Sequence, residues 1–233
     1  MYRTRTIGLL IISILAAAAW AGEQVLLQKA SGEVLVRPGV TETWLPATSG
    51  QALPADATIR TGAGSSAIIV VRSSNRTLSL PAEVMVDVSD LRELTQEELM
   101  LKLTMERVRA TSYEWKNREL NLPATTTFRG APKERAEELT EGNLAEGRLQ
   151  LNGARVLYNN AFYSTSALKA MDVLRRYPSL SSFDSRMLIA EALQKARLKG
   201  EALNEYVAIS RLPDLTPEQQ ALVASRIAEL KKN

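Results

Sequence analysis

Histidine and cysteine are absent from the 233-residue chain, so the chemistry open to it is that of carboxylates, lysines, serines and tyrosines. The missing histidine excludes the most common general base, the most common zinc ligand and every Ser-His-Asp triad. The missing cysteine excludes thiolate chemistry and disulfides. A glycosidase would pass this filter, because it needs only two carboxyl groups at a suitable separation. A carboxylate-dependent glycan hydrolase therefore stays open as an alternative function.

Acidic residues are densest in the stretch KERAEELTEG, residues 133–142. Lys133 and Arg135 are interleaved with these acids, as is typical of the solvated face of a helix. This pattern singles out no pair of carboxylates. We accordingly assign no catalytic residue, no metal ligand and no cofactor.

A second candidate is the turn Gly62-Ala63-Gly64 within TIRTGAGSSAIIVV. A phosphate-binding loop would need the N-terminus of a helix behind it, whereas the β-branched run Ile68 to Val71 favours a buried strand. We expect both glycines to supply the positive φ angles of a tight turn between strands.

The N-terminal stretch MYRTRTIGLLIISILAAAAWAGEQ has the layout of a Sec signal peptide. Arg3 and Arg5 precede an apolar run from Ile7 to Ala19, and small residues at Ala19 and Ala21 favour cleavage after Ala21. The alternative is an uncleaved anchor, but the apolar run is shorter than the ~20 residues that span a bilayer. The leader predicts a periplasmic protein without a stable membrane span.

Cleavage would remove two arginines and no acid, which lowers the formal charge from +3 to +1. A nearly neutral mature chain gives no reason to expect nucleic acid as a partner. A cysteine-free exported chain suits the bacterial periplasm or the face of the outer membrane.

Residues 25–94 show the short alternating pattern of an antiparallel β-sandwich or roll. In GEVLVRPG, Val34 and Val36 share one face, and Pro38-Gly39 ends the run. Further strands are expected at residues 58–61, 67–72, 77–80 and 83–88, with turn-forming residues between them.

One succession in this region comprises Gly32-x-Val34-x-Val36, Trp44, Gly50, Leu53, Asp56, Ile59-Arg60-Thr61-Gly62, Ser66-Ala67 and Leu78-x-Leu80-Pro81. This succession resembles the FecR-type domain of bacterial envelope proteins over about residues 30 to 90. The namesake members of that family relay an outer-membrane signal to a sigma factor through a cytoplasmic segment and a membrane span. A signal peptide occupies that position here. The resemblance thus implies an extracytoplasmic β module, and it leaves a regulator of envelope signalling as a further alternative.

The stretch LTQEEL predicts a helix over residues 96–110. Thr95 and Glu98 form a capping box, and Leu94 and Leu99 occupy hydrophobic-staple positions. The alternative is an edge strand, because every second residue from 99 to 105 is apolar. We expect the helix to lie on the β module through Leu99, Leu103, Met105 and Val108. Two prolines and a threonine run then predict an extended connector, so that residues 95–146 are a capped helix plus a connector.

Residues 147–233 are helical in pattern, and the pattern repeats. Ala154 and Leu157 recur 36 residues later as Ala190 and Leu193. At an interval of 35 residues, Ala167, Met171, Leu174 and Pro178 recur as Ala202, Tyr206, Ile209 and Pro213. Such a repeat resembles tetratricopeptide (TPR) repeats, which implies stacked helical hairpins, and Thr216-Pro217 predicts a terminal helix. The alternative is a plain helical bundle.

In a TPR-like array the first helix of each hairpin lines a concave surface. That placement predicts a groove formed by Arg155, Tyr158, Asn159, Glu191, Gln194 and Lys195. Mixed polar grooves of this kind receive peptide segments or helices. In a plain bundle the same residues would be ordinary solvated positions.

Together these patterns predict an α+β chain of two domains. Its parts are a signal peptide at 1–21, a FecR-like β domain at 25–94, the capped helix and connector at 95–146, and a TPR-like helical domain at 147–233. The expected function is non-catalytic binding or scaffolding in the periplasm. The helical domain would bind a protein, and the β domain a second protein or a cell-wall glycan such as peptidoglycan.

Overall fold

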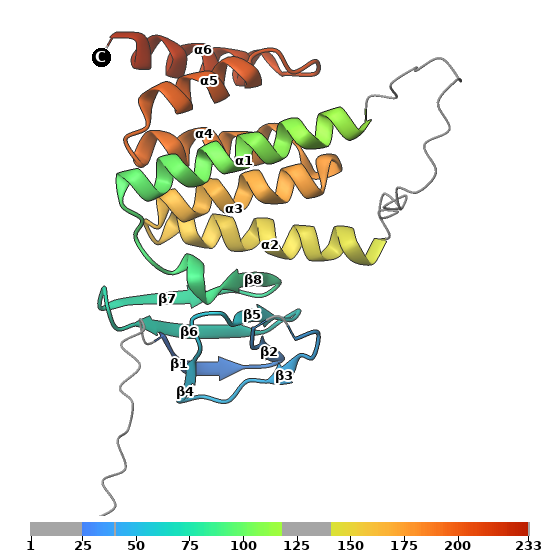
Figure 1. Ribbon diagram of the computed structural model, residues 1–233, viewed down its shortest axis with the longest axis vertical. Coiled ribbons are helices and arrows are strands. Elements are labelled where there is room, and N and C mark those ends of the chain that lie inside the picture. The colour runs from blue at the N-terminus through green and yellow to red at the C-terminus, as the bar shows by residue number, and fades with distance from the viewer. Residues whose placement is uncertain (1–24, 40, 118–140, 233) are drawn as a thin grey trace, which may run out of the picture.

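The computed structural model describes residues 25–39, 41–117 and 141–232. The predicted leader and the connector from residue 118 to 140 therefore lie outside the described residues. Within the described part, an antiparallel β region is followed by a helical region (Figure 1). This arrangement confirms the α+β class. No helix among the described residues combines the length and the apolar character needed to cross a membrane.

The β region consists of two four-stranded antiparallel sheets that pack around one core. Sheet A has the order β4-β1-β6-β7 and comprises β4 (Gln51–Leu53), β1 (Val25–Ser31), β6 (Ser66–Val71) and β7 (Arg76–Leu80). Sheet B has the order β3-β2-β5-β8 and comprises β3 (Leu45–Pro46), β2 (Val34–Arg37), β5 (Thr58–Thr61) and β8 (Val84–Asp87). Alternation along the strands buries Val34 and Val36, as their spacing predicted.

The two glycines of the turn between β5 and β6 have different roles. Gly64 adopts the expected positive φ of 65°. Gly62 does not, and it is small for another reason: a Cβ there would come 2.5 Å from Oε2 of Glu33. The expectation of two left-handed glycines is therefore wrong for Gly62, which lies against the flexible Glu33 side chain.

Helix α1 (Gln96–Asn117) begins where the capping box predicted. The backbone N–H of Glu98 donates to the Thr95 hydroxyl (3.2 Å), and the Thr95 N–H donates to the Glu98 carboxylate (3.2 Å). Its position on the β module, however, was predicted wrongly. Leu99 and Leu103 pack in the core of the helical region, against α3 (Tyr163–Arg176). Met105 and Val108, predicted to lie on the same packed face, are instead 48 % and 61 % exposed, so only half of that predicted face is buried.

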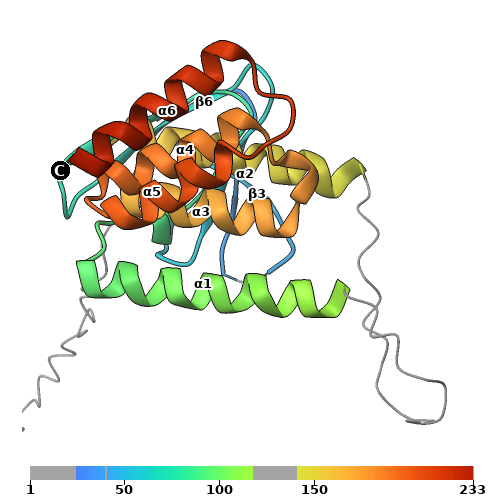
Figure 2. The same cartoon turned by 90° about the horizontal axis from the view of Figure 1, so that it is seen from above.

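The remaining helices stack as layers on the β region (Figures 1 and 2). Helix α2 (Glu141–Asn159) pairs with α3, and α4 (Phe183–Lys195) pairs with α5 (Lys199–Ile209). Helix α6 (Pro217–Lys232) packs on α5 and starts at the predicted proline. Two short 3₁₀ turns, η1 (Val88–Asp90) and η2 (Pro178–Leu180), complete the order.

Corresponding residues in the turns of the two hairpins lie 36 positions apart in the sequence. Ala161 and Arg197 hold matching left-handed conformations, with φ of 62° and 64°. The following N–H groups close matching bonds, from Phe162 to the Leu157 carbonyl (2.9 Å) and from Leu198 to the Leu193 carbonyl (3.0 Å). This is the Schellman geometry that ends a helix.

The 35-residue match on the second helices is off by one residue. The buried residues of α3 that correspond to Ala202, Tyr206 and Ile209 are Ser166, Ala170 and Val173. Met171 and Leu174, chosen from the sequence, are only half-buried. Because Met171 and Leu174 are larger than the buried Ala170 and Val173, the sequence pattern indicated the wrong set of residues, one position along the helix, as the buried set.

Helix α2 joins the helical region to the β region. It runs along β8, an edge strand, and its Val156 and Leu157 are buried in the β core together with Phe162 from the turn after it. The Asn152 side chain donates a hydrogen bond to the carbonyl of Glu83 (2.9 Å). Helix α2 therefore contributes to two cores, with Leu151 and Ala154 in that of the helical region.

Candidate functional site

The predicted groove residues come from two hairpins, and four of the six meet. Tyr158 at the end of α2 lies beside Glu191, Gln194 and Lys195 of α4, and these side chains line a groove of about 350 Å³. Arg226 and Glu229 of α6 complete its wall. We call this site the α2-α4-α6 groove.

Hydrogen bonds fix the floor of the groove. The Tyr158 hydroxyl donates to Glu191 Oε2 (3.4 Å), and the buried Tyr206 hydroxyl donates to Gln194 Oε1 (2.9 Å). The Tyr158 ring also meets Tyr163 edge-on, with 5.4 Å between ring centroids. Burial, reinforced by the charge of Glu191, raises the pKa of Tyr158.

Arg226 and Glu229 were not predicted. Arg226 Nη1 lies 3.4 Å from Glu229 Oε2, while its Nε is buried and has no hydrogen-bond partner. The Arg226 side chain as a whole is 38 % exposed, so its terminal N–H groups, rather than the buried Nε, are within reach of an acceptor on a ligand. The sequence did not indicate this pair, because charged residues at i,i+3 spacing are common on the solvated face of a helix.

Arg155 and Asn159 do not line the α2-α4-α6 groove. Both are exposed, and Arg155 donates to Asn152 Oδ1 one turn earlier on α2 (3.0 Å). Asn159 follows Tyr158 by one residue, a rotation of about 100° around the helix. Their predicted place in the groove is therefore not what the structure shows.

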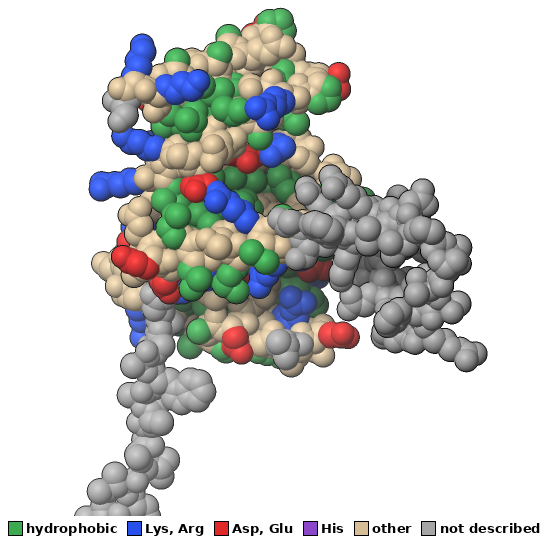
Figure 3. All heavy atoms as spheres, turned by 45° about the horizontal axis from the view of Figure 1, so that its top comes forward, with side chains coloured by type: hydrophobic (Ala, Val, Ile, Leu, Met, Phe, Trp, Pro, Cys, Tyr) green, Lys and Arg blue, Asp and Glu red, His purple; other side chains and the backbone are tan. Residues whose placement is uncertain are grey.

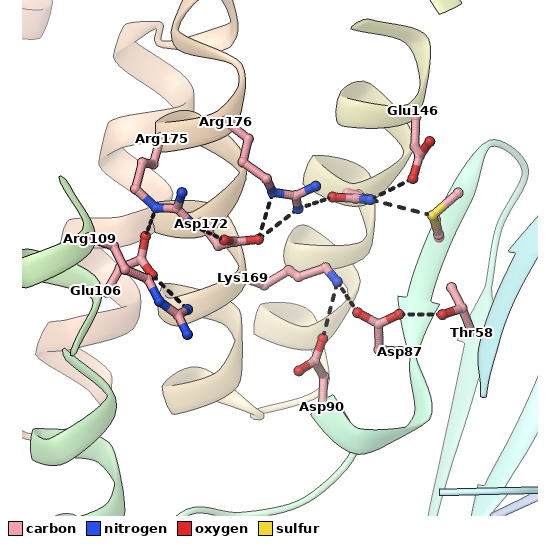
Figure 4. Close-up of polar contacts among 12 residues, drawn as sticks. Thr58, Asp87, Asp90, Glu106, Arg109, Glu146, Lys169, Asp172, Arg175 and Arg176 are labelled. Atoms are coloured by element: carbon pink, nitrogen blue, oxygen red, sulfur yellow. Dashed lines mark hydrogen bonds and ion pairs between the residues drawn. The ribbon is translucent and has the colours of Figure 1, made fainter. Parts of the chain in front are cut away.

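A second polar site lies where β8, η1, α1 and α3 meet (Figure 4). The Lys169 ammonium of α3 binds Asp87 of β8 and lies 3.5 Å from Asp90 of η1. The Lys169 side chain is only 9 % exposed. Asp87 also accepts a hydrogen bond from the Thr58 hydroxyl (2.6 Å).

The two carboxyl groups around Lys169 have opposite pKa shifts. Burial disfavours the charged form of Asp87, but Lys169 and the Thr58 hydroxyl outweigh it and hold the pKa below its usual value. Burial raises the pKa of Asp90 to about 6, and Lys169 opposes this only in part. Despite its own burial, Lys169 has a raised pKa because Asp90 and Asp87 favour its charge.

Ion pairs continue from this point along α3. Asp172 binds Arg175 and Arg176 (2.7 Å to Arg176), and Arg175 reaches Glu106 of α1 (2.5 Å). Arg176 donates to Gln150 of α2 (2.5 Å). A cavity of about 330 Å³ borders this junction cluster, lined among others by Asp87, Asp90, Lys102, Glu106, Lys169 and Asp172. Among the described residues no group of three or more acidic side chains is arranged to hold a metal ion.

A third feature lies on the outer face of sheet B. The guanidinium carbons of Arg37 and Arg60 lie 4.8 and 4.9 Å from the ring centroid of Trp44. Neither arginine forms a salt bridge within the described residues. Leu45, the next residue after Trp44, is 52 % exposed.

Comparisons with known proteins leave these sites to be interpreted from their own geometry. No protein-family model, no curated protein and no solved structure matches the chain. The FecR-type and TPR resemblances therefore remain predictions from the residues that carry them.

Proposed function

We propose that the chain is a non-catalytic binding protein of the bacterial envelope, and that the α2-α4-α6 groove receives a segment of a partner protein. The observation that carries this proposal is the meeting of Tyr158, Glu191, Gln194 and Lys195 with the partly exposed Arg226 side chain in one groove. These side chains come from three helices far apart in the sequence.

The chemistry of the groove fits a peptide with polar side chains. Glu191 and Glu229 offer acceptors, while Lys195 and Arg226 offer donors, so the lining carries two charges of each sign. An extended segment or a helix can satisfy such a mixed surface through its backbone and side chains. On the face shown in Figure 3, lysine and arginine side chains are likewise scattered over the helical layers among apolar and acidic ones.

A pull-down from the periplasm tests this function with point substitutions. The full chain serves as bait, because α2 contributes to the β core and removal of the helical domain would expose that core. Lys195→Glu should deplete a captured protein at least several-fold relative to the parent. Lys231→Glu, which makes the same charge change at an exposed position on α6, is the matched control. Identical capture by all three baits would contradict the proposal.

The β region is proposed to bind an acidic cell-wall glycan, and the Arg37-Trp44-Arg60 cluster supports this part. Stacking on the Trp44 ring holds two guanidinium groups near the surface with donors for carboxylate or phosphate groups. Co-sedimentation with purified peptidoglycan tests it. Arg37→Gln with Arg60→Gln should reduce the bound fraction, while Lys231→Gln with Lys232→Gln, which removes two exposed positive charges from α6, should reduce it less. Equal binding by the parent and the double variant would contradict glycan recognition at this cluster.

The junction cluster favours one alternative function, a carboxylate-dependent glycan hydrolase. Asp87 and Asp90 border a cavity and have pKa shifts of opposite sign, as in a pair made of a general acid and an ionised partner. Their ion pairs with the buried Lys169 support a structural role instead. Release of soluble sugars from peptidoglycan by the purified protein, abolished in Asp90→Asn, would establish the hydrolase over the binding protein.

A further inference from the structure

A cavity of about 400 Å³ lies between sheet B and helix α2, apart from the α2-α4-α6 groove and the junction cluster. Its lining includes four charged side chains, Glu33, Arg60, Glu83 and Arg148. Arg60 also stacks on the Trp44 ring, so the cavity adjoins the outer face of sheet B that is proposed to bind a glycan. We call it the β5-α2 cavity.

The two glutamates lie on either side of Gly62 at one end of sheet B. The Gly62 N–H donates to the Glu33 carbonyl (2.9 Å), and the Glu83 N–H donates to the Gly62 carbonyl (3.3 Å). Gly62 has no side chain, and the Glu33 carboxylate occupies the space over it. The cavity therefore has two carboxylates along one side, from the residues that precede β2 and β8.

Glu83 is held in a backbone conformation that glutamate rarely adopts. Its φ is 56°, in the left-handed region that glycine and asparagine occupy more readily. Its N–H is bonded to Gly62, and its carbonyl accepts a hydrogen bond from the Asn152 side chain (2.9 Å). Backbone strain of this kind is typical of binding and catalytic sites. Here the strained residue places a carboxylate in the wall of a cavity.

The two arginines come from opposite walls of the cavity. Arg60 lies on β5, and Arg148 lies on α2. Among the described residues, neither these arginines nor the two glutamates form an ion pair. A ligand with charge of one sign only would be attracted by one pair of side chains and repelled by the other. A ligand that carries both a carboxylate and an ammonium group can form charge-assisted hydrogen bonds with both pairs.

We propose that the β5-α2 cavity binds the peptide stem of a cell-wall glycan, with a stem carboxylate against Arg60 and Arg148 and a stem ammonium group against Glu33 and Glu83. A stem that contains a diamino acid carries both groups, whereas the sugar chain alone offers no ammonium group. The inference rests on the proposed glycan binding by the β region. It adds that the peptide, and not only the sugar chain, is recognised.

Isothermal titration of the full chain with soluble disaccharide-peptide fragments of peptidoglycan tests the ammonium contact. Fragments with a free diamino-acid amine should bind about tenfold more tightly than the same fragments after acetylation, which removes the charge. Glu33→Gln with Glu83→Gln should lower this ratio to about twofold, because the carboxylates that bind the ammonium group are gone. Glu97→Gln with Asp214→Asn neutralises two exposed acids of the helical region and should leave the ratio unchanged.

Arg148→Gln tests the carboxylate contact, and it should weaken the binding of the free and the acetylated fragment alike. Equal affinity of the parent for the two fragments, or a full ratio in the Glu33→Gln, Glu83→Gln variant, would overturn the peptide site. Peptide-free glycan strands that bind as tightly as the fragments would also overturn it, while glycan binding by the β region would stand. If the parent binds neither fragments nor strands, both the peptide site and the glycan proposal are wrong.

Discussion

Gly153 of α2 lies directly against the backbone carbonyl of Met85 in β8, so closely that a Cβ at position 153 would come 1.9 Å from the oxygen. This contact lets the helix cover the edge strand of sheet B and insert Val156 and Leu157 into the β core. Edge strands left open invite pairing with other chains, and here a helix protects one. The contact also fixes the groove-forming helices on a rigid support.

Gly153→Ala should therefore be strongly destabilising, although alanine is the better helix former. The added methyl must displace β8 or α2, which we expect to lower the free energy of unfolding by about 2 to 3 kcal/mol. Gly200→Ala is the matched control, since nothing lies within 4 Å of a Cβ there, and it should be neutral or stabilising by up to about 1 kcal/mol. Urea denaturation followed by circular dichroism measures both, and equal effects would show that α2 and β8 are not in close contact.

Lys169→Met should be among the most destabilising single substitutions in the helical region. It leaves Asp87 and Asp90 without the ammonium between them, which we expect to cost about 3 to 5 kcal/mol at neutral pH. Adding Asp87→Asn and Asp90→Asn to the same chain removes the uncompensated charges and should recover much of that loss. Thermal unfolding of the single and triple variants makes the comparison. A triple variant no more stable than Lys169→Met would show that ion pairing is not the reason for the loss.

The raised pKa of Asp90 predicts a pH dependence of stability. Burial lifts it from 3.8 to about 6, so the folded chain holds this proton more tightly than the unfolded chain does. The resulting stabilisation is complete below about pH 4 and is lost as pH rises through about 6. Asp87 acts in the opposite sense, because its lowered pKa gives stability that is lost as pH falls.

The free energy of unfolding of Asp90→Asn should therefore increase relative to that of the parent as pH rises from 4 to 7, by at most about 3 kcal/mol. Lys169 faces Asp90 as well, and its raised pKa keeps it charged over this range. Denaturation midpoints across that pH interval give the difference. A difference in midpoint between variant and parent that does not change with pH would contradict the raised pKa of Asp90.

The hairpin turns predict two stabilising substitutions. Ala161 and Arg197 both hold positive φ, which costs a residue with a side chain about 1 to 2 kcal/mol and costs glycine nothing. Ala161→Gly and Arg197→Gly should each raise the free energy of unfolding by about 0.5 to 1 kcal/mol after the greater entropy of unfolded glycine is counted. Ser164→Gly, in the first turn of α3, should lower it. If both turn substitutions destabilise the chain, the left-handed turns are incorrect.

Local signals in the sequence were sufficient for many of the elements, although no strand was predicted at β1, β3 or β4. The alternation at Val34 and Val36 located β2, the Thr95-Glu98 capping box located the start of α1, and Pro217 located the start of α6. Each of these signals acts over a few neighbouring residues. They need no knowledge of what the element packs against.

Packing partners could not be read in the same way. Of the four residues predicted on the packed face of α1, Leu99 and Leu103 are buried, against α3 and not the β module, whereas Met105 and Val108 are exposed. Lys169 looks like a solvated lysine until Asp87 and Asp90 are placed beside it from elements about 80 residues earlier. Only part of the groove could be predicted, for the same reason. The repeat placed α2 beside α4, whereas the position of Arg226 is set by the packing of α6.

Site-specific photo-crosslinking in living cells tests the binding role of the groove most directly. A photoreactive amino acid at position 194 should crosslink to one defined protein partner, and Arg226→Gln in the same chain should reduce that crosslink several-fold. The same probe at Lys29, an exposed position on β1, should not crosslink to this partner. A probe at position 194 that yields no crosslink, or the same products as the probe at position 29, would contradict the α2-α4-α6 groove as a binding site.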